Sequence, residues 1–134
     1  MVRKPELLAP AGDLNRLRYA LAYGADAVYA GQPAFSLRAR ENGFRSLDDI
    51  AEGIAICREQ GKKFYLTSNV IARNGKVEPF CKTLLEAAAL GPDAVIVADP
   101  GVVGFLRKEI PEMEVHLSVQ ANTTNRLTAA FWAD

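Results

Sequence analysis

The chain has 134 residues and a mass of 14.6 kDa, a size typical of one domain. Hydrophobic residues make up 49% and charged residues 24%, which excludes a wholly disordered chain. Lysine plus arginine and aspartate plus glutamate each number 16, so a strongly basic surface is excluded, although a local basic patch is not. No apolar run approaches the roughly 18 residues that span a bilayer, so we expect a cytoplasmic location and no membrane partner.

Short apolar runs alternate with longer helical patterns along the chain. Strands are expected at residues 6–9, 27–30, 63–70, 94–98 and 115–119. Helices are expected at residues 14–23, 47–60, 78–90, 102–110 and 126–134. Asp13 and Ser46 are placed to cap the first two helices, and Asn74-Gly75 is typical of a turn. The polar loop from residue 31 to 45 is long for a compact domain, which favours a functional role.

Continuous apolar strands separated by amphipathic helices predict an α/β fold with a parallel sheet covered by helices. Residues 23–31 and 90–98 are similar to each other, each with a glycine that ends a helix, an aspartate in the loop and an apolar strand, which indicates repeated units. About five β/α units would form a partial, incomplete TIM-type barrel, since a complete one needs about 250 residues. A five-stranded open sheet also fits the length, but the first turn lacks a phosphate-binding pattern.

Polar residues follow the expected strands at the edge where parallel α/β folds place their sites. They are Gln32, Asn69, Asp99, Gln120 and Asn122. Strand alternation puts Tyr65, Thr67 and Asn69 on one face and His116, Ser118 and Gln120 on another, and both faces would point into a barrel centre. These groups would line a polar pocket, or they would satisfy one another and cap helices, and capping is at least as favoured for Asp99.

Arg38 and Arg40, in the long loop, have side chains suited to carboxylate or phosphate groups. They would bind an anion or pair in solvent with Glu41 or Asp48. The lone histidine, His116, is more typical of a packed strand residue than of a base. Cys57 and Cys81 have no metal-ligand spacing and are interpreted as small buried residues on helices, so no metal site is predicted.

Three stretches resemble the opening of peptidase family U32: ELLAPAG at residues 6–12, YGADAVYAG at 23–31 and QAN at 120–122. Residues 31–33, 36–38, 91–94, 99–101 and 116–122 are similar to the branch of that family that takes part in tRNA hydroxylation. The resemblance covers essentially the whole chain. It implies that residues 1–134 are the amino-terminal part of a U32-type (β/α) barrel domain, without the cysteine-cluster region that follows in longer members.

For such a longer parent, the resemblance implies four cysteines that bind an iron–sulfur cluster. It also implies hydroxylation of tRNA wobble uridine to 5-hydroxyuridine, which requires prephenate and no molecular oxygen. Sister branches act on ribosomal RNA or in ubiquinone synthesis, and an older description of the family is collagenase-like peptidases. The present 134 residues are expected to hold no cofactor and to be inactive alone.

Within this reading, Asn69, Asp99, Gln120 and Asn122 would line the substrate pocket, and Arg38 and Arg40 would meet a phosphate or a carboxylate such as that of prephenate. The catalytic residues stay unassigned. tRNA is the expected partner of the parent, and the unpaired strand edges of a half barrel favour self-association. Two alternatives remain open: a U32 peptidase, and a non-catalytic binding or assembly module.

Overall fold

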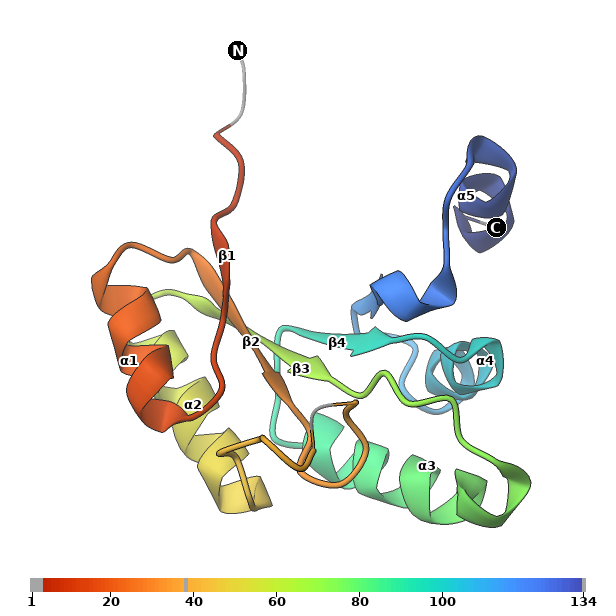
Figure 1. The fold of residues 1–134 in the computed structure, drawn as a ribbon, viewed down its shortest axis with the longest axis horizontal. Coiled ribbons are helices and arrows are strands. Elements are labelled where there is room, and N and C mark those ends of the chain that lie inside the picture. Colours follow the sequence, from red (N-terminus) through yellow and green to blue (C-terminus); the bar gives the residue numbers. More distant parts are fainter. Residues whose placement is uncertain (1–3, 38, 134) are drawn as a thin grey trace.

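The computed structural model describes residues 4–37 and 39–133 and shows five strands that alternate with helices (Figure 1). The strands are β1 (Leu8–Pro10), β2 (Ala27–Gly31), β3 (Lys63–Thr67), β4 (Ala94–Val97) and β5 (Val115–Leu117). The helices are α1 (Leu14–Ala22), α2 (Leu47–Glu59), α3 (Asn74–Ala88), α4 (Pro100–Glu109), the single 3₁₀ turn η1 (Val119–Ala121) and α5 (Arg126–Ala133).

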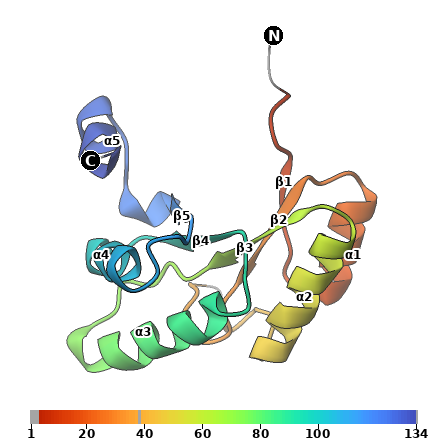
Figure 2. The same cartoon turned by 180° about the vertical axis from the view of Figure 1, so that it is seen from behind.

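The strands form one sheet in the order β1-β2-β3-β4-β5, and every neighbouring pair is parallel. Because each new strand adds at the same edge and parallel crossovers are right-handed, α1 to α4 all lie on one face of the sheet. Figures 1 and 2 show α1 and α2 together at the β1 end and α3 and α4 towards the β5 end. A doubly wound sheet would reverse its strand order. The predicted α/β class and the five β/α units of a partial barrel are therefore confirmed.

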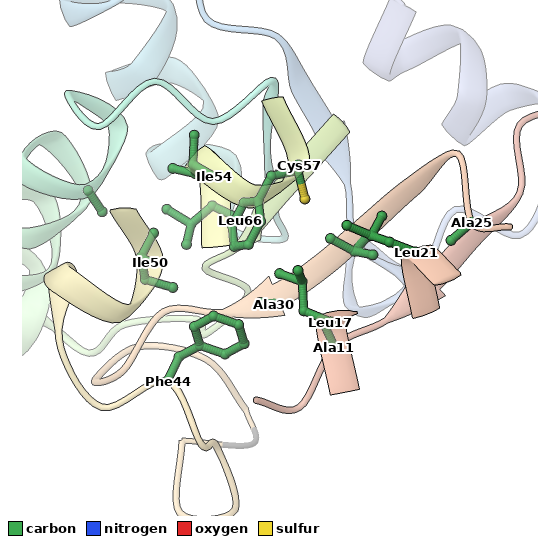
Figure 3. Packing of buried hydrophobic residues seen from close by; sticks show 13 residues of the cluster. Ala11, Leu17, Leu21, Ala25, Ala30, Phe44, Ile50, Ile54, Cys57 and Leu66 are labelled. Atoms are coloured by element: carbon green, nitrogen blue, oxygen red, sulfur yellow. The ribbon is translucent and has the colours of Figure 1, made fainter. Parts of the chain in front are cut away.

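The core lies between the sheet and the helices, in two clusters. One packs α1 and α2 against β2 and β3, with Leu17, Ile50, Ile54, Phe64 and Leu66 among its members (Figure 3). The other packs α3 and α4 against Val95 and Val97 of β4. Strand residues of the opposite parity form the face of the sheet that no described helix covers, and we call this the open face. It carries Tyr29, Tyr65, Thr67, Ile96 and His116.

Local capping chemistry sets several helix ends where the sequence predicts them. Asp13 accepts from Arg16 N–H at 2.6 Å, and Ser46 and Asp49 form a reciprocal capping box on α2. The aspartates of the two similar stretches, Asp26 and Asp93, have the same structural role. Asp26 accepts the N–H of Leu7 at 2.9 Å, and Asp93 accepts the N–H of Phe64 at 2.8 Å, so each aspartate fastens its loop to the start of an earlier strand.

Several predicted boundaries are wrong because tertiary hydrogen bonds compete with local pattern. β3 ends at Thr67 rather than residue 70, since Ser68 turns its hydroxyl to Gln32. β5 ends at Leu117 rather than residue 119, since the Ser118 hydroxyl accepts from Gln120 N–H and starts η1. Consequently Asn69, Ser118 and Gln120 are not strand residues, and the shared strand faces predicted for them are wrong.

The third helix begins at Asn74, so Asn74-Gly75 is its first turn rather than a separate turn before it. Pro79 lies inside that helix, where it has no N–H to donate to the carbonyl four residues earlier. β1 comprises residues 8–10 rather than 6–9, and Pro10 is tolerated because β1 is an edge strand. Within the described residues, no helix is both long and apolar enough to cross a membrane.

Candidate functional site at the carboxyl ends of the strands

The carboxyl ends of β2 to β5 are joined by backbone hydrogen bonds that continue beyond the strands. Gln32 N–H donates to Thr67 O at 2.8 Å, Ser68 N–H to Ile96 O at 2.8 Å, and Ser118 N–H to Val97 O at 2.7 Å. The buried Ser68 hydroxyl also donates to the Gln32 side-chain oxygen. These bonds place the residues that follow β2, β3 and β5 along one edge of the sheet.

Asn69 bridges two loops at this edge. Its Oδ1 accepts from the N–H of Leu37 at 3.2 Å, and its Nδ2 donates to Ser118 Oγ at 3.2 Å. Ser118 Oγ in turn accepts from Gln120 N–H at 3.3 Å. The prediction that Asn69 and Gln120 lie at one edge agrees with this geometry. The Asn69 side chain, however, forms one hydrogen bond to each of the two loops. Its first structural role is to hold the loop after β2 against the turn after β5.

The long loop after β2 is anchored at its far end. Gly43 N–H donates to Gly12 O at 2.7 Å, Asn42 Nδ2 donates to Gly31 O at 2.6 Å, and the Phe44 ring is fully buried against Phe64. A Cβ on Gly43 would lie 2.5 Å from the Cβ of Asp13, so only glycine allows this close approach. These contacts fix the end of the loop against residues at or just beyond the ends of β1 and β2.

The remaining predicted site residues lie at the same edge but have different surroundings. Asp99 caps α4 by accepting from Gly101 N–H at 2.8 Å, which is the capping role that the sequence left open. Gln120 is exposed on η1, and Asn122 follows it in the left-handed conformation with φ of 54°. Arg40 is exposed and forms no ion pair with any residue that the structure describes, while Arg38 lies outside the described residues.

A second polar cluster lies on the open face at the amino ends of the strands. The Tyr65 hydroxyl donates to Glu6 at 2.6 Å and Lys63 pairs with Glu6 at 3.0 Å. These hydrogen bonds lower the pKa of Glu6, whereas burial, followed by the Glu6 carboxylate, raises the pKa of Tyr65 to about 12. His116 packs edge-on against Tyr65 with ring centroids 4.8 Å apart and contacts Glu114 at 2.7 Å. His116 is thus a packed strand residue, as its sequence context favours.

Two of the cavities formed by the described residues lie away from the carboxyl-end edge. One, of about 550 Å³, is lined by Lys4, Pro5, Glu6, Asp26, Gly61, Lys62 and Lys63 at the amino ends of β1 to β3. The other, of about 390 Å³, lies between the end of α3 and the segment from Ile110 to Glu114 that leads into β5. We place the candidate site at the carboxyl ends despite these volumes, because the functional groups of parallel α/β folds converge there and the amino ends serve stability.

The cysteines do not fit an iron–sulfur cluster. Cys57 is 1% exposed within the α2 core, and burial, followed by the nearby Asp93 charge, raises the pKa of its thiol to about 11. A cluster needs thiolate ligands, usually four. Cys81 lies half-buried on α3. Among the described residues, no group of three or more histidine, cysteine, aspartate or glutamate side chains could hold a metal ion.

Sequence reasoning missed how the hydroxyls at this edge are used. Ser118 joins Asn69 to Gln120, and Ser68 joins β3 to Gln32, whereas the sequence predicts only a shared polar face for Ser118 and no role for Ser68. The available signal was position, since both serines stand directly after an apolar strand. Which partner each hydroxyl takes depends on the register of strands far apart in sequence.

Comparison with known proteins places these features in a family. The family model described as Peptidase family U32 matches residues 12–134. The tRNA hydroxylation protein P of Escherichia coli is 50% identical over 129 residues, which is 96% of this chain and 28% of that protein. The 23S rRNA 5-hydroxycytidine C2501 synthase of Escherichia coli is 39% identical over 96% of this chain and 19% of that protein.

The fold is also shared with a solved structure. The U32 peptidase Mk0906 superposes with a TM-score of 0.76 at 15% identity, covering 96% of this chain and 56% of that one. This likeness concerns the fold alone. By these coverages, the chain spans less than a third of the length of each of the two Escherichia coli relatives. It spans roughly half the length of the solved peptidase.

Proposed function

Since the chain belongs to peptidase family U32, we propose that it forms part of the substrate site of a protein that hydroxylates tRNA wobble uridine to 5-hydroxyuridine. The observation that carries the proposal is 50% identity to a tRNA hydroxylation protein over 96% of the chain. A second relative is named for a hydroxycytidine in ribosomal RNA, so both names concern hydroxylation of RNA. RNA is thus the proposed partner and the cytoplasm the proposed location.

The carboxyl-end edge supports this role because it gathers neutral amide and hydroxyl groups. Such groups both donate and accept, so they can match the donors and acceptors on the edge of a base. We propose that Asn69, Asp99, Gln120 and Asn122 line the pocket, with Asn69 acting mainly by fixing the loop after β2 at Leu37. Arg38 and Arg40 are proposed to meet RNA phosphate or the carboxylates of prephenate, for which arginine geometry is suited.

The proposed iron–sulfur cluster would take its ligands from outside these 134 residues, because Cys57 is a core thiol and only one further cysteine is present. Such a cluster supplies one-electron chemistry when bound. The residues of this chain would contribute substrate binding and orientation. The unpaired outer edges of β1 and β5 further support self-association, which light scattering at high concentration would detect.

The test is nucleoside mass spectrometry of tRNA from cells in which the gene encoding this chain is deleted. We expect 5-hydroxyuridine and the nucleosides made from it to disappear and to return when the gene is supplied again. Unchanged 5-hydroxyuridine after deletion would contradict the proposal and favour a binding or assembly module.

Peptidase activity is the second candidate, because the matching solved structure is described as a U32 peptidase. In the described part of the chain, the contacts of His116 are with Glu114 and Tyr65 rather than with a serine or cysteine nucleophile. Cleavage of a labelled protein by the product of the intact gene, lost in a variant that carries Gln120→Ala at the exposed pocket residue of η1, would support this alternative.

A further inference from the structure

Two buried hydroxyls at the carboxyl-end edge lack a hydrogen-bond partner in the part of the chain that the structure describes. They are Ser36 Oγ and Thr67 Oγ1. Ser36 is 6% exposed and lies in the loop after β2, while Thr67 ends β3. Buried polar groups in native proteins nearly always have partners, so this orphaned pair is a candidate contact for a bound group.

The register of the sheet brings the two hydroxyls together. Thr67 is the direct neighbour of Gly31 across the β2–β3 pair, and both belong to the open face. A Cβ on Gly31 would lie only 2.5 Å from Ser36 Oγ, so the serine hydroxyl occupies the space beside Gly31 that a side chain would fill. The two hydroxyls therefore flank Gly31 on the side of the sheet that no described helix covers.

The surroundings of this pair are neutral and partly apolar. Ile96 is paired with Thr67 in register, and Tyr29 lies two residues before Gly31 on the same face. An apolar floor with an aromatic ring and two hydroxyls suits a flat, uncharged ring with a polar edge.

We infer that Ser36 and Thr67 form a subsite for the polar edge of a pyrimidine base of RNA, with Tyr29 and Ile96 beneath the ring; this inference rests on the proposed function. A hydroxyl both donates and accepts, and its hydrogen rotates to suit its partner. The same pair can therefore match the carbonyl and N–H of uracil or the amino group and ring nitrogen of cytosine. This versatility agrees with relatives named for tRNA hydroxylation and for 5-hydroxycytidine.

Access needs only a local change. Thr67 is partly exposed although its Oγ1 is covered, so its accessible area belongs to other atoms. A bound base would reach Thr67 Oγ1 after rotation about χ1 of this partly exposed side chain, since rotamers of such side chains exchange readily. The base itself must leave its stack to reach the sheet, as in other enzymes that modify bases.

Thr67→Val tests the inference with little change in shape, and Thr83→Val is the matched control. The Thr83 hydroxyl donates to Pro79 O at 2.9 Å within α3, so it already has a partner. Thermal unfolding of the 134-residue chain should show that Thr67→Val keeps or raises the melting temperature, because an orphaned hydroxyl is removed. A lower melting temperature for Thr67→Val would show that the hydroxyl has a structural partner, such as a buried water, and would overturn the inference.

Base binding is measured with an anticodon stem-loop RNA that carries uridine at the wobble position, and with the same RNA made abasic there. We expect Thr67→Val to weaken binding of the uridine RNA about three- to tenfold, the range for one hydrogen bond, and to leave the abasic RNA unaffected. Thr83→Val should leave both unchanged. Equal affinity of the wild-type chain for the two RNAs would overturn the inference.

The proposed function fails separately. If gene deletion abolishes 5-hydroxyuridine while Thr67→Val and Ser36→Ala leave both its level and base binding unchanged, only the subsite is wrong. If deletion leaves 5-hydroxyuridine intact while the uridine RNA still binds through Thr67, the base subsite stands and the proposed reaction is wrong.

Discussion

Replacing Asn69 with alanine should destabilise the fold modestly and release the loop after β2. The variant loses the 3.2 Å bond from Leu37 N–H and the 3.2 Å bond to Ser118 Oγ. A typical intramolecular hydrogen bond contributes about 0.5–1.5 kcal/mol. Leu37 is 56% exposed, so water replaces the lost acceptor at its N–H, and Ser118 Oγ keeps its bond from Gln120 N–H. We therefore expect the free energy of unfolding to fall by about 1–2 kcal/mol, in the lower part of the two-bond range.

The assay is urea denaturation of the 134-residue chain followed by circular dichroism. A double-mutant cycle with Ser118→Ala isolates the bond between the two side chains, and we expect a coupling energy of about 0.5–1.5 kcal/mol. Asn15→Ala, at an exposed position of α1, is the matched control and should change stability by less than about 0.5 kcal/mol. A coupling energy near zero would refute the bridge between the loops.

Three further predictions follow from the structure. Gly53→Ala should destabilise the chain by about 1–3 kcal/mol, because the new Cβ would lie 2.9 Å from the buried Phe64 ring. Gly104→Ala has open space around it and should stabilise α4 by about 0.5–1 kcal/mol. Equal effects of the two substitutions in urea denaturation would contradict this packing. The Leu7 N–H and then Lys62 lower the pKa of Asp26, so its contribution to stability is full above about pH 4 and is lost as the pH falls through the lowered pKa. The difference in free energy of unfolding between the wild-type chain and Asp26→Asn should therefore become smaller below about pH 4. A difference that does not change with pH in acid titrations would contradict this prediction. A thiol reagent at pH 8 should label the half-buried Cys81 of the folded chain first. It should reach Cys57, whose thiol has a pKa of about 11, only when the chain unfolds. Rapid labelling of Cys57 in the folded chain would be inconsistent with its burial.

Features set by local chemistry could be predicted from the sequence. Asp13 and Ser46 cap their helices because a short polar side chain reaches the next free N–H groups within its own turn. Gly24 follows α1 with φ of 98°, a conformation that only glycine adopts at no cost. The parallel sheet was predictable because strands buried between layers are apolar along their whole length.

Features set by pairing across the sheet could not be predicted. The end of β3 depends on Ser68, whose partner Gln32 lies 36 residues away. Ser118, which follows β5, accepts from Asn69, which lies 49 residues away. The carboxyl-end location of Asn69 was predictable from topology, but its two bonds were not. The substrate roles of Asn69, Asp99, Gln120 and Asn122 remain predictions.

The central claim is that the carboxyl ends of these strands hold a pyrimidine for hydroxylation. Its most direct test is the amount of 5-hydroxyuridine in tRNA from cells whose chromosomal gene carries Thr67→Val, with the protein level and melting temperature matched to wild type. We predict a clear fall in 5-hydroxyuridine for Thr67→Val and none for Thr83→Val. Equal amounts in both variants, together with a full loss on gene deletion, would contradict the placement of the site.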